Sequence, residues 1–345
     1  RIRRTLEGRD LITEGRHPGA TGRMHRLVVD HLKTHNLPET DLVDEFIIHR
    51  AYELGADFTK APELWEVDSI TDALPDMLTR MPGLLEQVPD FIRHVALRYA
   101  TDTRIAVMLQ NLTAHLSGTS ARTSFLAHML LGDALQNTDP AQARESYQRS
   151  LAITRHLGEI WPEDLQARRA LTVALNNVAG MLENSDPGRA LGLYEESLDI
   201  RRDLDGRLSG DLQARRDLTV ALDNVAGMLK YSDPGRALGL YEESLDISRE
   251  LAVRLPGNLQ ALWDLGVSAA RLAQLLPTED PERIPLWREA AISLRDALAI
   301  QPENKELGRM SYQAALEYVD CRPDDRDEWL AYAAELADRF GFGKE

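Results

Sequence analysis

The chain has 345 residues, of which 43% are hydrophobic, and a formal net charge of −16. This acidity argues against broad binding to nucleic acids or anionic membranes, because both need a cationic protein surface. No apolar run approaches the roughly 18 residues that a membrane-spanning helix needs. The one cysteine, Cys321, has no second thiol with which to form an internal disulfide. We therefore expect a cytoplasmic protein, with no nucleic acid and no membrane among its partners.

Residues 1–116 show no internal repeat and no strand-like alternation, and their pattern predicts helices. We expect these helices over about Thr21–His35, Glu39–Leu54, Pro89–Tyr99 and Thr103–Leu116. Gly55 should end the second of them. Prolines 62, 75, 82 and 89 should divide the segment between 61 and 89 into short helices. The sequence thus predicts a helical N-terminal region of unknown role.

A 47-residue repeat follows. The segment Asp164–Gly210 recurs from Asp211 onward with nine differences. Asp-Pro pairs begin at four positions 47 residues apart: Asp139, Asp186, Asp233 and Asp280. Because Asp is a favoured N-cap and Pro suits the first helical position, each pair should begin the second helix of a helix pair. A period of this length is typical of a solenoid, whose units bury their apolar faces only against neighbours.

The repeat frame predicts the domain organisation. We expect four repeats within 117–304, over 117–163, 164–210, 211–257 and 258–304. The second helix of the fourth repeat departs from the frame, because Ile284–Pro285 is an insertion. Residues 305–345 should cap the array with two helices, about Lys305–Val319 and Asp327–Phe340, because a solenoid needs a terminal element with a polar outer face.

Helix A of the second repeat carries Leu175, Val178–Ala179 and Leu182, and helix B carries Ala190, Tyr194 and Ser197–Leu198. This pattern resembles the tetratricopeptide repeat family. Since 47 residues exceed the usual period of about 34, it is most similar to the long-helix variety of kinesin light chains and bacterial signalling proteins. The resemblance implies an all-α, right-handed α-solenoid after the helical N-terminal region. It also implies a protein-interaction scaffold, part of a larger bacterial signalling or defence protein.

The nine differences between the near-identical repeats indicate where a partner binds. We place four of them in helix A: Ala170/Asp217, Asn176/Asp223, Glu183/Lys230 and Asn184/Tyr231. At about 100° per residue they lie on the side away from the apolar stripe, which in the resembled family lines a concave groove. Either this face contacts a partner, or an exposed face has drifted. The predicted partner-binding residues are Gln136, Asn176, Glu183, Asn184, Asp223, Lys230 and Tyr231.

These positions also indicate the chemistry of the partner. They are too acidic for the Lys, Arg and Asn clamp with which some members of the family hold a terminal carboxylate. We expect a protein or peptide that is basic or rich in amide groups, anchored on Tyr231, because aromatic anchors dominate interface energetics. Since the chain begins at Arg1, a domain of the same polypeptide before residue 1 is another expected partner.

No motif predicts catalysis, a metal site or a cofactor. His31 and His35 have a chelating spacing, but the Glu of an H-E-x-x-H motif is missing. Acidic neighbours of Cys321 should raise the thiol pKa, and no Gly-Lys-Ser/Thr follows the glycines at 15, 19 and 22. We therefore expect no enzyme. Two alternatives stay open: an enzyme whose site lies in residues 1–116, with the array recruiting substrate, and a peptide-sensing regulator whose N-terminus binds DNA.

Overall fold

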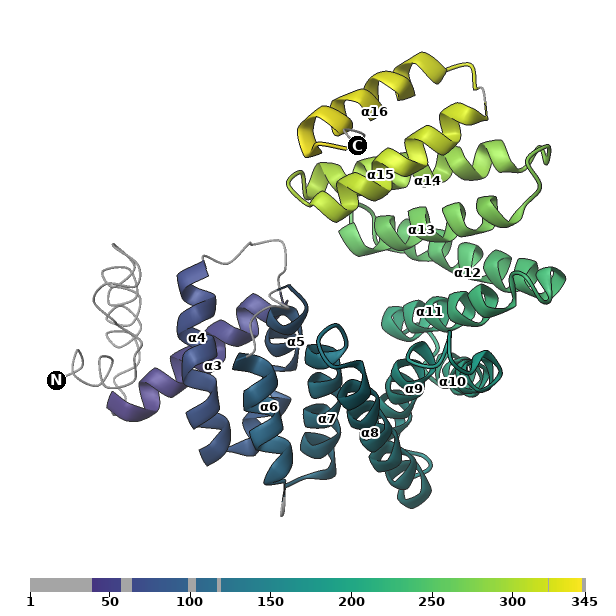
Figure 1. Ribbon diagram of the computed structural model, residues 1–345. Helices are drawn as coiled ribbons and strands as arrows, with labels where there is room; N and C mark the ends of the chain where they lie inside the picture. The colour runs from purple at the N-terminus through teal and green to yellow at the C-terminus, as the bar shows by residue number, and fades with distance from the viewer. Residues whose placement is uncertain (1–38, 57–63, 99–103, 117–118, 322, 343–345) are drawn as a thin grey trace. The chain divides into compact units, whose positions relative to one another are not determined.

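The structure is a computed structural model that describes residues 39–56, 64–98, 104–116, 119–321 and 323–342. In these residues every regular element is a helix (Figure 1). The chain divides into two compact units, residues 1–178 and 179–345. Of the described helices, none is long and apolar enough to cross a membrane. The helix expected over Thr21–His35, its two candidate metal-binding histidines and the glycines at 15, 19 and 22 lie outside the described residues.

The first unit is a stack of helix pairs. These are α3 (Glu39–Ala56) with α4 (Leu64–Arg80), α5 (Pro89–Arg98) with α6 (Arg104–Ala114), and α7 (Ala121–Leu135) with α8 (Pro140–Ile160). A short 3-10 helix, η1 (Pro82–Glu86), precedes α5, and α9 (Leu165–Gly180) reaches the end of the unit. Helix α3 packs on α5 and α5 on α7, while α4 packs on α6 (Figure 1). The N-terminal helices therefore stack as the repeats do, although their sequence shows no repeat.

The expectation that Pro75 ends a helix is wrong. Helix α4 runs through it from Leu64 to Arg80. Leu74, Met77 and Leu78 of the same helix are almost completely buried. Burying side chains of this size stabilises by about 1.5–3 kcal/mol each, which together exceeds the roughly 3 kcal/mol cost of an internal proline.

The expectation that Gly55 ends its helix is also wrong, because α3 continues to Ala56. The glycine serves packing instead. A Cβ at Gly55 would lie 2.7 Å from the backbone nitrogen of Phe91, at the start of α5. Only glycine lets the two helices approach this closely.

The second unit continues with α10 (Pro187–Arg207) and three helix pairs. These pairs are α11 (Leu212–Leu229) with α12 (Pro234–Arg254), α13 (Leu259–Leu275) with α14 (Arg283–Ile300), and α15 (Lys305–Asp320) with α16 (Arg326–Phe340). Each helix from α10 onward packs on the next (Figure 1). The protein is therefore an all-α solenoid, as the repeat period predicts.

The two predicted C-terminal helices are present as α15 and α16, within a residue or two of their expected bounds. Helix α16 buries Trp329, Ala333 and Leu336. Its exposed side carries acidic residues, among them Glu328 and Asp338. Helix α16 thus has one buried face and one charged face, which suits the capping role expected of it.

The Asp-Pro prediction is confirmed at three of its four positions. Asp139, Asp186 and Asp233 each accept a hydrogen bond from a backbone N–H in the first turn, and a proline is the first residue of each helix. At Asp280 it is wrong, because α14 begins at Arg283. If α14 began at Pro281, Pro285 would be its fifth residue and would clash with the carbonyl four residues back. With the start at Arg283, Pro285 lies in the first turn, where helix N–H groups have no intrahelical partner.

Candidate partner-binding site

The seven predicted residues occupy two places in the repeat. Asn176 and Asp223 lie inside helix A, in α9 and α11. The others lie just after helix A, at its C-cap or in the turn to helix B: Gln136, Glu183, Asn184, Lys230 and Tyr231. Helix A is thus shorter than predicted, since α9 ends at Gly180 and α11 at Leu229. Gln136 and Asn176, both half-buried, belong to the first unit and the other five to the second.

Asp223 faces the next repeat. Its side chain forms an ion pair with Arg271 of α13, and the residue is only 9% exposed. Burial raises the pKa of Asp223, and the Arg271 guanidinium opposes that shift. The carboxylate is therefore engaged at the boundary between the third and fourth repeats, in an ion pair with the partly exposed Arg271.

Asp217, the other acid that distinguishes the third repeat from the second, faces the preceding repeat. It pairs with the buried Arg201 of α10 and accepts a hydrogen bond from Gln213 Nε2 at 2.7 Å. Arg201 is itself one of the nine differences. At the next boundary Ser248 replaces it, with its hydroxyl 3.0 Å from that of Ser268 of α13. The two differences therefore form a matched pair that fits one repeat to its neighbour.

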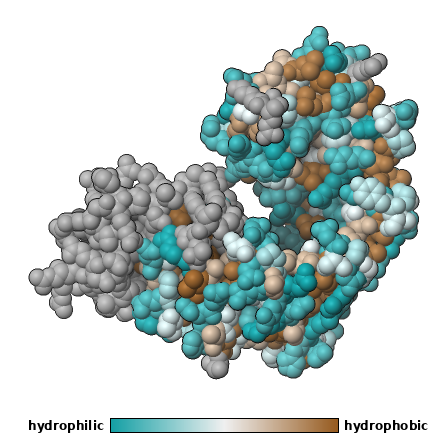
Figure 2. Space-filling view, viewed as in Figure 1, coloured by the Kyte–Doolittle hydropathy of each residue, from teal (hydrophilic) through white to brown (hydrophobic). Residues whose placement is uncertain are grey.

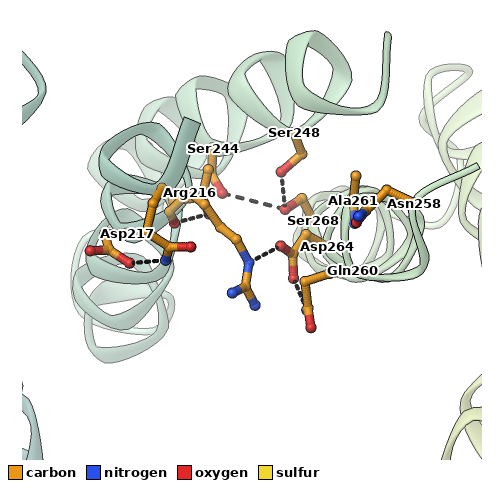
Figure 3. A network of polar contacts seen from close by, with 11 residues as sticks. Arg216, Asp217, Ser244, Ser248, Asn258, Gln260, Ala261, Asp264 and Ser268 are labelled. Atoms are coloured by element: carbon orange, nitrogen blue, oxygen red, sulfur yellow. Dashed lines mark hydrogen bonds and ion pairs between the residues drawn. The ribbon is translucent and has the colours of Figure 1, made fainter. Parts of the chain in front are cut away.

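Figure 3 shows this next boundary, between α11, α12 and α13. The Arg216 side chain extends from α11 to Asp264 of α13, which also accepts a hydrogen bond from Gln260 at 2.8 Å. Ser268 of α13 lies against two serine hydroxyls of α12. The serine hydroxyls are buried, whereas Arg216 and Asp264 are partly exposed and Gln260 is exposed. All of these groups contact one another within or across the boundary, so we assign them a structural role.

Helix B contributes to the same boundaries. Arg215 of α11 donates to Asp205 of α10 at 3.0 Å and to Glu250 of α12 at 2.7 Å. Both acids occupy positions at which the twin repeats differ. Arg215 thus joins three helices through charge-assisted hydrogen bonds. The Asp205 contact joins the second repeat to the third, whereas the Glu250 contact joins the two helices of the third repeat.

In the first repeat, helix A is α7, and its polar side chains contact both α8 and the N-terminal helix α5. Asp133 accepts hydrogen bonds from Tyr147 of α8 at 2.7 Å and from Arg93 of α5 at 2.9 Å. Arg93 also lies 3.2 Å from the sulfur of Met129, which is equivalent to Asn176 and Asp223. In this repeat the N-terminal helix α5 therefore contacts helix A at the position equivalent to Asn176 and Asp223.

In the turn after helix A, the second and third repeats differ at exposed side chains. Polar residues cover most of the face drawn in Figure 2, with apolar residues in smaller patches. In the second repeat, Glu183 accepts a hydrogen bond from Tyr194 OH at 2.7 Å. The third repeat has Lys230 there, followed by Tyr231, which is 87% exposed. Lys230 Nζ lies 4.8 Å from the centre of the Tyr231 ring. This turn thus presents an aromatic ring and a cation to solvent.

A helical wheel does not distinguish the differences that form ion pairs with neighbouring repeats from those that are exposed after the helix end. It placed Asp217, Asp223, Lys230 and Tyr231 on one face of one helix. In the structure the first two face neighbouring repeats, and the last two follow the helix end. The missed signal was Arg201, because a difference that adds an arginine in one repeat and an aspartate in the next indicates an ion pair.

Among known proteins, no family model and no curated protein matches the chain. One similar solved structure is a monomeric mutant of IFIT1 with m7Gppp-AAAA (anti conformation of cap). The identity is 13%, the match covers 100% of this chain and 73% of that chain, and the TM-score is 0.32. A likeness this distant carries no argument about a site or a function. What the packed helix pairs establish is the class of the protein, an all-α helical-repeat solenoid.

Proposed function

We propose that this chain is a non-enzymatic interaction scaffold of the tetratricopeptide type, which binds a protein or peptide segment at the helix-A side of its third repeat. The observation that carries the proposal is the turn of Lys230 and Tyr231. A ring that is 87% exposed has no packing role in the solenoid. Tyrosine offers a large contact area with little conformational entropy to lose, which suits it to anchor a partner.

The surface that leads to this turn supports an extended segment as the ligand. Gln213, Val220 and Asn224 are spaced along one side of α11 that ends at Tyr231. Val220 is exposed, and the two amides are exposed or half-buried. Amide side chains both donate and accept hydrogen bonds, so they can pair with the backbone of an extended peptide.

The charge of the chain supports a basic or amide-rich partner. A net charge of −16 attracts cationic segments and repels polyanions. For the same reason we propose a protein partner, and neither a nucleic acid nor a membrane. Lys230 is a local exception, and we propose that it binds backbone carbonyls or amide oxygens of the segment beside Tyr231.

The test exchanges the turn of the third repeat for that of the second. A photocrosslinking amino acid at position 231 of the full chain identifies the bound protein, and the same group at the exposed Val253 reports background. Binding of the identified protein is then measured by calorimetry. Lys230→Glu with Tyr231→Asn should weaken it about tenfold or more. The melting temperature should change by less than about 2 °C, because both new residues already occupy this place in the second repeat.

The matched control is the reverse exchange in the second repeat, Glu183→Lys with Asn184→Tyr, which should leave the affinity unchanged. Equal crosslinking at positions 231 and 253, or an unaltered affinity in the first variant, would show that the turn is not the binding site. A large fall in melting temperature would instead assign Tyr231 a structural role.

A further inference from the structure

A second surface feature lies away from helix A, in the loop between α8 and α9. Five consecutive residues, Ile160 to Asp164, line an open hollow of about 450 Å³. Trp161 is 54% exposed, and Ile160 beside it is exposed as well. The Trp161 backbone N–H donates to the carbonyl of Leu157, so the ring is carried by the fixed end of a helix.

The next two repeats show that the fold needs no aromatic ring here. Their equivalent loops read Arg207-Leu208-Ser209 and Arg254-Leu255-Pro256. Leu208 and Leu255 occupy the same C-cap position, make the same backbone hydrogen bond four residues back, and are half-buried. A leucine therefore suffices to close a repeat at this point. The exposed part of the Trp161 ring is therefore not needed for packing, because Leu208 and Leu255 have no such ring.

Three acidic residues, Glu159, Glu163 and Asp164, lie within three positions of Trp161 in the chain. Glu163 and Asp164 line the hollow, and the side chain of Glu159, 3.7 Å from His156, is exposed. Asp164 is held in place, because its Oδ1 accepts hydrogen bonds from the backbone N–H groups of Gln166 and Ala167 at 2.8 and 3.3 Å. A cation over the indole face is attracted both by the ring quadrupole and by these carboxylates. An anion is repelled by both.

We propose that this Trp161 hollow, residues 160–164, is a second docking site, for an arginine-bearing segment of a protein partner. The guanidinium stacks on the indole while aliphatic neighbours of the arginine contact Ile160 and Pro162. Arginine fits better than lysine because its planar, weakly hydrated group stacks on an aromatic face and offers several donors to carboxylates. This site stands on observations separate from those at Tyr231, so either assignment can fail without the other.

The test follows the Trp161 ring directly in the full chain. The protein is labelled with 5-fluorotryptophan, and the fluorine resonance of Trp161 is assigned with Trp161→Leu, which installs the residue of the next two repeats. Three capped heptapeptides serve as probes, identical except for a central arginine, citrulline or glutamate in an aliphatic context. Citrulline keeps the shape of arginine and removes its charge.

The arginine peptide should shift the Trp161 resonance in a saturable way and leave the other tryptophan resonances in place. The citrulline peptide should bind about three- to fivefold more weakly, as expected for loss of a cation–π contact at an exposed site, and the glutamate peptide should cause no shift. Glu159→Gln with Glu163→Gln should weaken the arginine peptide severalfold.

No Trp161 shift with millimolar arginine peptide would overturn the proposal. Equal affinities for the arginine and citrulline peptides would overturn the charge recognition on which it depends. Because Trp161→Leu reproduces the equivalent loops, its melting temperature should match that of the parent chain. Lost peptide binding in that variant, measured by calorimetry because the Trp161 resonance is gone, would therefore report the site itself.

Discussion

His128 is a residue at which the first repeat departs from the apolar core of the next two. It is 8% exposed in α7, where the twin repeats have Leu175 and Leu222. Its Nδ1 has no hydrogen-bond partner among the described residues. Burial lowers the pKa of His128 and the Arg149 guanidinium adds to the shift, while Glu145 opposes it. The folded chain therefore favours the neutral imidazole.

This imidazole should make the stability of the first unit depend on pH. Above the ordinary histidine pKa of 6.5, the folded and unfolded states are both neutral at His128. As the pH falls below 6.5, the unfolded chain binds a proton at His128 that the folded chain does not bind. The free energy of unfolding therefore decreases until the pH has fallen past the lowered pKa of the folded state. His128→Leu should remove this loss between about pH 7 and 5. Urea unfolding of both proteins across this range is the measurement, and parallel pH profiles would contradict the prediction.

At the scale of elements, Asp-Pro has two structural outcomes in this chain. Asp233 Oδ1 accepts from the backbone N–H of Arg236 at 3.1 Å and so caps α12. Asp280 Oδ1 accepts from the N–H of Glu282 at 2.9 Å, in a turn before α14. The motif is the same, and the proline that follows at 285 decides the outcome.

Asp233→Ala should therefore destabilise the second unit by about 1 kcal/mol, the usual cost of losing an N-cap. Asp280→Ala should cost clearly less, because no helix end loses its cap. Denaturant unfolding of the two single variants compares them in one background. Equal losses would mean that the Asp280 turn has the energetic role of a cap.

At the scale of the whole molecule, the solenoid begins before its recognisable repeats. Helix α5 packs on α7, and Arg93 donates to the buried Asp133 across that contact. Glu86 of η1 accepts from the Ser120 and Thr123 hydroxyls at the start of α7, at 2.7 and 2.6 Å. The described helices before residue 117 thus supply packing and polar partners to the first repeat.

Arg93→Gln should lower the free energy of unfolding of the first unit by about 1 kcal/mol, a modest value because the arginine is half exposed and screened by solvent. Hydrogen exchange should speed up in α5 and α7 and stay unchanged in α11–α14. Arg122→Gln is the control, since Arg122 is exposed and lies 3.6 Å from Glu86. Similar changes in both variants, or changes in both units, would contradict this role of Arg93.

Much of the fold was predictable because its signals are local. The 47-residue period, three Asp caps and the two C-terminal amphipathic helices depend on residues within one helix pair. The stacking of the N-terminal helices was not predictable. It depends on contacts such as that of Gly55 with Phe91, and no sequence repeat indicates them. The seven positions of the candidate site were named from the sequence and stay a prediction; which of them face solvent could not be read from the sequence.

The sequence by itself determined that this chain is a stack of helix pairs, because apolar periodicity and capping act over a few residues. Only the tertiary structure decided what the differences between the twin repeats do. Asp223 meets Arg271 from 48 residues away, whereas Tyr231, eight residues after Asp223, remains exposed. The physical reason is that burial and ion pairing belong to the boundary between repeats, and that boundary exists only once the helices are packed.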